Sequence, residues 1–236
     1  MHIGILVTNT DDSEFAKQRP LDGEKFVALL QPLRPHWRFT AIQVKNGEFP
    51  ERLQDFDGFV ITGSPASANG DEPWVLKLLD TIREINSRKM PTVGVCFGHQ
   101  AIARALGGEV GGNTAGWGFG VSPTHFSSQE AWMQPRRTTL NLYAAHIEQV
   151  LKPPAGAIVL GGDEFCPVGS YKLGNHFFTT EYHPEISTEF MLDLIDELNA
   201  YVGEDVAANA KRQVRDTQVD GEIFANWMVN FFEMKR

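Results

Sequence analysis

The sequence predicts an α/β protein whose central sheet is mostly parallel and is covered by helices. Three observations favour this class. Short apolar runs alternate with stretches of helical periodicity along the first half of the chain. These runs are continuous rather than alternating, which is typical of strands buried on both faces. Residues 118–178 instead carry short β-type runs broken by Gly and Pro, which indicate a smaller antiparallel section or an extension of the sheet.

The first half alternates predicted strands with predicted helices. Continuous apolar or β-branched runs predict strands at residues 3–7, 39–44, 57–61 and 91–95. Apolar positions three or four residues apart predict helices at residues 21–33, 73–85 and 100–106. The polar stretch 8–20, which follows the first strand, is the best candidate for a mobile loop.

The second half is predicted to be β-rich and then helical. Short β-type runs lie at residues 119–122, 139–143, 157–160 and 176–180. Helical patterns follow at residues 188–201 and 222–232, with a looser stretch at 204–214. Large apolar side chains in the last helix have i, i+3, i+4, i+7, i+8 spacing, which predicts a core-facing helix. No repeat or interdomain linker is visible, so we expect residues 1–236 to form a single domain.

The composition excludes several classes of function. With 42% apolar residues, the chain is too hydrophobic to be mainly disordered. Its net charge of −9 argues against binding to nucleic acid or to an anionic membrane, because both would repel it. No apolar run approaches the ~18 residues that span a bilayer. Cys96 and Cys166 form neither a disulfide framework nor a CxxC zinc pattern, which favours a reducing compartment, most simply the cytoplasm.

The most informative segment places Cys96 between a predicted strand and a predicted helix. Gly94 and Gly98 flank it at −2 and +2, which is the spacing of a nucleophile elbow. The N-terminus of the following helix favours a thiolate, so we expect a lowered thiol pKa. The amide of Phe97 is well placed to stabilise an oxyanion. The alternative is a buried structural cysteine, which is the interpretation we give to Cys166.

A second segment, TEYHPE at residues 180–185, follows the predicted strand 176–180. In extended chain, residues i and i+2 point the same way, so His183 and Glu185 share a face. Glu185 can then orient the imidazole while His183 takes the thiol proton. An isolated HPE sequence is more often a surface turn. Together with the upstream elbow, the order Cys, His, Glu predicts a catalytic triad.

Two further features bear on the site. Gly63, in ITGSP at residues 61–65, ends another predicted strand, and a glycine there lets a backbone amide approach a ligand closely. It is a candidate oxyanion donor, with an ordinary turn as the alternative. His146 and Glu148 are two residues apart, but two ligands without a third make a poor zinc site. We therefore predict no metal.

These motifs resemble the class I, triad-type glutamine amidotransferase domain. The resemblance extends from about residue 3 to about residue 189, with 190–236 as a C-terminal helical extension. It rests on GVCFGHQAIARALGG at 94–108, EYHPE at 181–185 and ITGSP at 61–65, with support from Gly116-Trp117 and from AHIE at 145–148 followed by Pro153. It implies a flavodoxin-like architecture and a reaction that requires no cofactor.

The resemblance also implies roles for individual residues. The triad falls on Cys96, His183 and Glu185. The oxyanion donors fall on the backbone of Gly63 and Phe97, and the substrate side on Gln100, Ala145, His146 and Glu181. The family commonly has Gln where this chain has Glu181, and often Ser or Asn where it has Ala145. We hypothesise that Glu181 tunes substrate choice away from simple glutamine; the alternative is that its side chain points into solvent.

The sequence thus predicts cysteine-dependent hydrolysis of the γ-carboxamide of glutamine through a thioester, with ammonia passed to a separate synthetase or acceptor. One alternative is a self-sufficient γ-glutamyl hydrolase or peptidase. A second is an inactive regulatory or binding protein that keeps the fold, against which the intact Cys–His–Glu set argues. The resemblance fills nearly the whole chain, so we expect a stand-alone member without a fused synthetase domain. Its ligand is expected to be a small molecule.

Overall fold

The computed structural model of the protein describes residues 1–234. The strands are β1 (His2–Val7), β2 (Arg38–Gln43), β3 (Gly58–Ile61), β4 (Thr92–Val95), β5 (Glu109–Gly112), β6 (Gly118–Phe126), β7 (Thr139–His146), β8 (Glu148–Lys152), β9 (Ala157–Gly162), β10 (Ser170–Leu173) and β11 (Phe177–Thr180). The α-helices are α1 (Glu14–Lys17), α2 (Asp22–Leu30), α3 (Pro73–Arg88), α4 (Phe97–Ala105), α5 (Thr188–Val202), α6 (Glu204–Asp216) and α7 (Gly221–Glu233). Two 3-10 turns, η1 (Val44–Asn46) and η2 (Leu53–Asp55), lie between β2 and β3.

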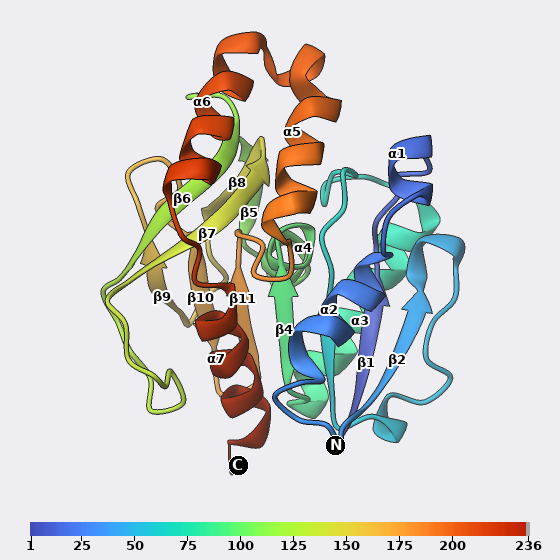
Figure 1. The fold of residues 1–236 in the computed structure, drawn as a ribbon. Helices are drawn as coiled ribbons and strands as arrows, with labels where there is room; N and C mark the ends of the chain where they lie inside the picture. Colours follow the sequence, from blue (N-terminus) through green and yellow to red (C-terminus); the bar gives the residue numbers. More distant parts are fainter. Residues whose placement is uncertain (235–236) are drawn as a thin grey trace.

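In this described part of the chain, the main sheet has nine strands in the order β2-β1-β3-β4-β11-β10-β9-β6-β7. The first five are mutually parallel. The remaining neighbours pair antiparallel, and β5 and β8 form a small antiparallel sheet of their own. The predicted class, a parallel α/β sheet with an antiparallel section, is confirmed (Figure 1).

Helices cover both faces of the sheet because successive strand residues point to opposite sides. Ile3, Ile5 and Val7 of β1 pack into one cluster with α2 and α7, whereas Leu6 packs into another with α3 and α4. The predicted core-facing stripe of α7 is confirmed, since its large apolar residues are all buried: Phe224, Trp227, Met228, Phe231 and Phe232. In a third hydrophobic cluster, α5 and α6 pack against β6 and β7 at one end of the sheet (Figure 1).

The structure differs from the sequence prediction in several elements. Helix α4 begins at Phe97, directly after the cysteine, rather than at residue 100. The predicted loop 8–20 contains α1, capped by Ser13, and Arg19 forms an ion pair with Asp193 of α5. The looser stretch 204–214 is a regular helix whose buried positions are Ala207, Ala210 and Val214, so few large apolar side chains mark its buried face. In residues 1–234, no helix combines the length and apolarity needed to cross a membrane.

Candidate active site

The candidate residues meet at one edge of the sheet. Strands β1, β3, β4 and β11 are parallel, so their carboxyl ends lie together. Thr8 follows β1, Gly63 follows β3 by two residues, Cys96 follows β4, and His183 follows β11 by three residues. The crevice outside the carboxyl ends of parallel strands is where α/β sheets commonly bind ligands.

Cys96 occupies a strained turn between β4 and α4. Its φ of +49° and ψ of −109° lie in a region that residues with a side chain rarely adopt. A Cβ on Gly94 would lie 2.7 Å from the Gly98 carbonyl oxygen, and one on Gly98 would overlap the Ile61 carbonyl. Both flanking residues must therefore be glycine for β4, the start of α4 and the end of β3 to pack this closely. The Cys96 amide donates to the Thr180 carbonyl at 2.8 Å, which ties the turn to β11.

His183 is held on both sides. Its Nδ1 lies 2.7 Å from Glu185 Oε1, and its backbone amide donates to the Tyr143 carbonyl of β7 at 2.8 Å. Because the carboxylate accepts, Nδ1 carries the proton and Nε2 is the basic nitrogen. The ring interacts electrostatically with Cys96, and Nε2 has no hydrogen-bond partner within residues 1–234. The imidazole thus has one nitrogen held by a carboxylate and one that is available to exchange a proton.

The electrostatics of the Cys96–His183 pair correct one expectation. Burial raises the pKa of the Cys96 thiol, which is 6% exposed, and His183 only partly opposes this effect. The predicted lowering of the thiol pKa is therefore wrong, because desolvation outweighs the positive partner. Burial also disfavours a charged His183, yet the charges of Glu185 and Cys96 raise its pKa well above the usual value. The arrangement therefore allows proton transfer from the thiol to a neighbouring base of raised pKa.

Gly63 packs directly against Cys96 and His183. A Cβ on Gly63 would lie 2.9 Å from His183 Cε1 and 3.6 Å from Cys96 Cβ. Any residue larger than glycine at position 63 would displace the imidazole of His183. The other predicted oxyanion donor, Phe97, is the first residue of α4, so its amide has no carbonyl partner inside that helix.

Thr8 fixes the peptide that carries the Gly63 amide. Its hydroxyl lies 2.9 Å from the carbonyl oxygens of both Thr62 and Gly63, and its amide donates to Thr62 Oγ1 at 3.0 Å. The Thr62 carbonyl also accepts from the Gly98 amide at 3.1 Å. In a trans peptide the N–H points opposite the C=O, so these bonds aim the Gly63 amide. Sequence reasoning missed Thr8, although its place directly after a parallel strand was a usable signal.

Gln100 and Glu181 form a buried pair. Gln100 Nε2 donates to Glu181 Oε1 at 2.7 Å and to the Glu148 carbonyl at 2.9 Å. Both amide protons of the predicted glutamine-holding side chain therefore have internal partners. Glu181 is fully buried, so the alternative that it points into solvent is wrong. Its burial raises the pKa of the carboxyl to about 8.

His146 and Ala145 lie on opposite faces of β7. The His146 Nδ1 donates to the Glu148 carbonyl at 3.1 Å, while Nε2 has no hydrogen-bond partner within the described residues. Burial lowers the pKa of His146 to about 4, so the ring is neutral at physiological pH. Its ring lies edge-on to that of Tyr182, the residue before His183. Ala145 packs instead with the α5–α6 cluster, so no side-chain contact brings it to Cys96.

The structure adds two neighbours that the sequence did not single out. His99 is fully buried, and its Nε2 lies 3.5 Å from Glu181 Oε2. Ser67 Oγ donates to Glu148 Oε2 at 2.7 Å, which joins the loop after β3 to β8. In residues 1–234, no group of three or more His, Cys, Asp or Glu side chains is arranged to hold a metal ion.

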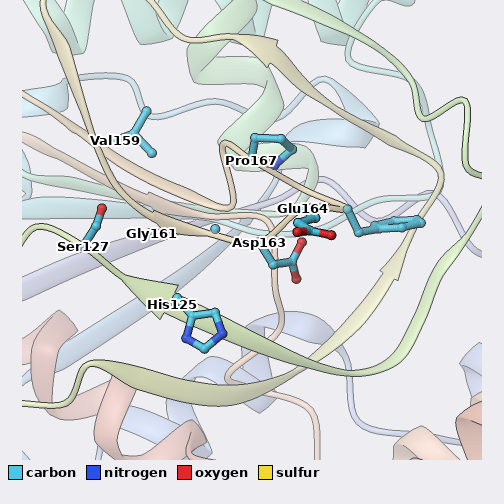
Figure 2. Close-up of a pocket in the computed structure, with 9 residues that line it drawn as sticks. His125, Ser127, Val159, Gly161, Asp163, Glu164 and Pro167 are labelled. Carbon is cyan, nitrogen blue, oxygen red and sulfur yellow. The ribbon is translucent and has the colours of Figure 1, made fainter.

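A separate pocket of about 840 Å³ lies over β6, β9 and the loop after β9. Figure 2 shows Asp163 and Glu164 on that loop, with His125 of β6 below them. The Asp163 carboxylate accepts from the Cys166 amide at 2.6 Å and from Ser122 Oγ at 2.9 Å. Asp163 therefore stabilises the conformation of the loop that forms this wall of the pocket.

Comparisons with known proteins agree with the fold and the motifs. The family model described as glutamine amidotransferase class-I matches residues 35–193. Gamma-glutamyl peptidase 3 of Arabidopsis thaliana is 30% identical over 240 residues, covering 97% of this chain and 95% of the relative. A glutamine-hydrolysing GMP synthase subunit from Sulfolobus acidocaldarius is 26% identical, covering 62% of this chain and 76% of the relative.

Solved structures show the same architecture. A glutamine amidotransferase from Thermotoga maritima superposes with a TM-score of 0.77 at 17% identity, covering 99% of this chain and 98% of that one. The family model covers well over half of the present chain, and the motifs on which the resemblance rests lie largely within it. The protein is therefore a member of the class I glutamine amidotransferase family.

Proposed function

We propose that the protein hydrolyses γ-glutamyl amide bonds, with Cys96 as the nucleophile, His183 as the base and acid, and Glu185 as the orienting carboxylate. The observation that carries this proposal is the convergence at one sheet edge. A strained cysteine, a histidine 2.7 Å from a carboxylate, and a glycine that only just clears that histidine come from three different strands. A merely structural cysteine would require none of these features.

The first step forms the nucleophile and the covalent bond. His183 Nε2 takes the thiol proton, and Cys96 Sγ attacks the γ-carbonyl carbon. The negative charge that develops on the carbonyl oxygen is stabilised by the amides of Gly63 and Phe97. Removal of one such donor typically costs roughly 3–4 kcal/mol of transition-state stabilisation.

The second step breaks the C–N bond and releases the enzyme. His183 gives its proton to the leaving nitrogen, which departs as an amine, and a γ-glutamyl thioester remains on Cys96. Water then attacks the thioester while His183 takes its proton. Collapse of that adduct breaks the C–S bond and releases the γ-carboxyl group, and His183 returns its proton to the Cys96 thiolate. The second proton of the water leaves when the carboxyl group ionises, and the released amine takes up a proton from solution. Each proton that His183 takes is thus given back within the cycle.

For the substrate class, we propose γ-glutamyl peptides, whose leaving group is an amino acid or peptide. Four gamma-glutamyl peptidases of Arabidopsis thaliana match 97–98% of this chain, so the likeness includes the C-terminal helices. A second candidate is glutamine, with ammonia passed to a separate synthetase. The match to the GMP synthase relative, over 62% of the chain, favours this candidate.

The test is product analysis with defined substrates. Purified protein is incubated with L-glutamine, γ-glutamyl-alanine and α-glutamyl-alanine, and glutamate, ammonia and alanine are measured. We expect alanine from the γ-linked dipeptide and little from its α-linked isomer. Faster release of ammonia from glutamine than of alanine would favour the second candidate. No release from either γ-linked substrate, or equal release from a Cys96→Ser variant, would refute the proposed function.

A further inference from the structure

Two buried polar atoms near Cys96 face each other and have no hydrogen-bond partner among the described residues. His99 Nε2 and Glu181 Oε2 lie 3.5 Å apart, both side chains are fully buried, and neither atom has a hydrogen-bond partner of normal geometry within residues 1–234. Two unpartnered lone pairs this close in a protein interior are unfavourable. A proton on one of them turns the contact into a hydrogen-bonding arrangement.

The surrounding bonds favour one arrangement of the protons. Thr179 Oγ1 has one proton and contacts both the Tyr171 carbonyl, at 3.0 Å, and His99 Nδ1, at 2.8 Å. Donation to the carbonyl, which can only accept, makes Thr179 Oγ1 the acceptor for a proton on His99 Nδ1, and in that tautomer Nε2 carries no proton. On the other side, Gln100 donates to Glu181 Oε1, which must accept. The atom left to carry a proton toward His99 is Glu181 Oε2.

We propose that Glu181 is a positioning residue for the reaction of Cys96: a neutral carboxylic acid that donates to His99, accepts from Gln100, and limits the reaction when it loses its proton at alkaline pH. This inference rests on the proposed role of Cys96. A neutral acid offers one donor and one free acceptor oxygen, and the amide of a glutamine can supply both of these as well.

The electrostatics agree with the geometry. Burial raises the pKa of Glu181 to about 8 and lowers that of His99 to about 3, so both groups favour the neutral form. An ion pair here would place two charges in the interior, which desolvation penalises. The proton therefore belongs to the carboxyl group at neutral pH.

Loss of that proton would act on the nucleophile. A negative charge on Glu181 raises the pKa of the Cys96 thiol and so opposes formation of the thiolate. Other titratable groups also face Glu181 or interact with it, and each can add a pH-dependent effect: His99 on α4, Tyr171 on β10, Cys166 before β10, and His183 after β11. A test must therefore isolate the contribution of Glu181.

The Glu181→Gln variant does so, because the amide keeps the donor and the acceptor but cannot titrate. The rate of Cys96 alkylation by iodoacetamide is measured by mass spectrometry from pH 6 to pH 10, together with kcat/KM for γ-glutamyl-alanine. We expect the ratio of the variant rate to the wild-type rate to rise by about tenfold from neutral to alkaline pH, which is the effect of one pKa unit on the thiol. Superimposable pH profiles would overturn the proposal.

Two measurements keep the inference testable on its own. If the wild type turns over no γ-glutamyl substrate, the alkylation profile still reports the charge beside Cys96. If the Glu181→Gln variant does not fold, infrared spectroscopy of the wild type replaces it. A protonated-carboxyl C=O band should be present at neutral pH and disappear near the raised pKa of Glu181. Its absence at neutral pH would contradict the proposal.

Discussion

The elbow at Cys96 and the loop that holds Cys166 present the same side chain in two settings. Both thiols are buried, and burial raises the pKa of each. The two regions differ in their partners. Cys96 has a positive φ and interacts with His183, which a carboxylate orients. The Cys166 backbone amide donates to Asp163, and further carboxylate charges disfavour its thiolate.

This difference shows that neither burial nor the direction of the pKa shift distinguishes the proposed nucleophile from the other cysteine. A thiol with a raised pKa can still react when a base with a raised pKa takes its proton. Cys166 has the raised pKa without such a base. The distinguishing features are therefore the strained turn and the adjacent imidazole, and variants of these features test the comparison.

Replacement of the two cysteines should give the largest contrast. Cys96→Ser should lower kcat/KM by at least about 10⁴-fold, because a hydroxyl is too weakly acidic for this base. Cys166→Ser, the matched control, should change it by less than about threefold, since that thiol takes no part in the reaction. Steady-state release of alanine from γ-glutamyl-alanine measures both. A comparable loss in the two variants would remove the distinction between the regions.

The orienting carboxylate should have a smaller effect than the nucleophile. Glu185→Gln keeps the shape of the side chain but removes the charge that raises the pKa of His183. We expect kcat to fall by up to about 10⁴-fold, less than in Cys96→Ser, because the third member of a triad is less critical than the first two. His183→Ala is the reference for complete loss of the base. Equal activity in both variants and the wild type would show that the HPE segment is only structural.

Gly63 tests how closely the site is packed. In Gly63→Ala the added Cβ would lie 2.9 Å from His183 Cε1, so the imidazole must move. The Gly63 amide, one of the two proposed oxyanion donors, should be displaced as well. We therefore expect kcat to fall by about 10²-fold. Gly112→Ala on β5 is the control, because its Cβ would enter open space. An active Gly63→Ala variant with native structure would argue against the proposed placement of the substrate carbonyl.

Much of the parallel half could be predicted from the sequence, and less of the remainder. Continuous apolar strands and the GxCxG elbow are local patterns, so β1 to β4 and the turn at Cys96 were predictable. Strand β11 was predicted as a strand, but in an antiparallel section or an extension of the sheet, because its parallel pairing with β4 joins distant parts of the sequence. Strands β5 and β8 were not, because they are short, partly exposed and paired across distant sequence. Helix α6 was underestimated because Ala207 and Ala210, rather than large side chains, lie on its buried face.

At the site, the limit was set by long-range contacts. The bond from His183 to Glu185 follows from a two-residue spacing and was predictable. The contact between His99 and Glu181 joins α4 to the segment after β11, and no local sequence pattern predicts it. Nor could the raised pKa of the Cys96 thiol be foreseen, since the degree of burial depends on the whole fold.

The smallest expected effect concerns stability and requires no turnover. The carboxyl of Glu181 titrates near 4.5 when unfolded and near 8 when folded, so between these values the folded protein binds more protons. Rising pH therefore favours unfolding across this window, and no further loss from this group is expected above it. The lowered pKa values of His99 and His146 act in the opposite direction, as pH falls below 6.5.

Urea denaturation at several pH values across this window can isolate the contribution of Glu181. The wild type should lose at least about 1 kcal/mol more unfolding free energy than Glu181→Gln as pH rises from 5 to 8, because the variant cannot lose a proton there. Glu189→Gln, which removes an exposed carboxyl on α5, is the control and should keep the wild-type slope. Parallel slopes for the wild type and Glu181→Gln would mean that the buried carboxyl is already ionised at pH 5, and the neutral acid beneath Cys96 would have to be abandoned.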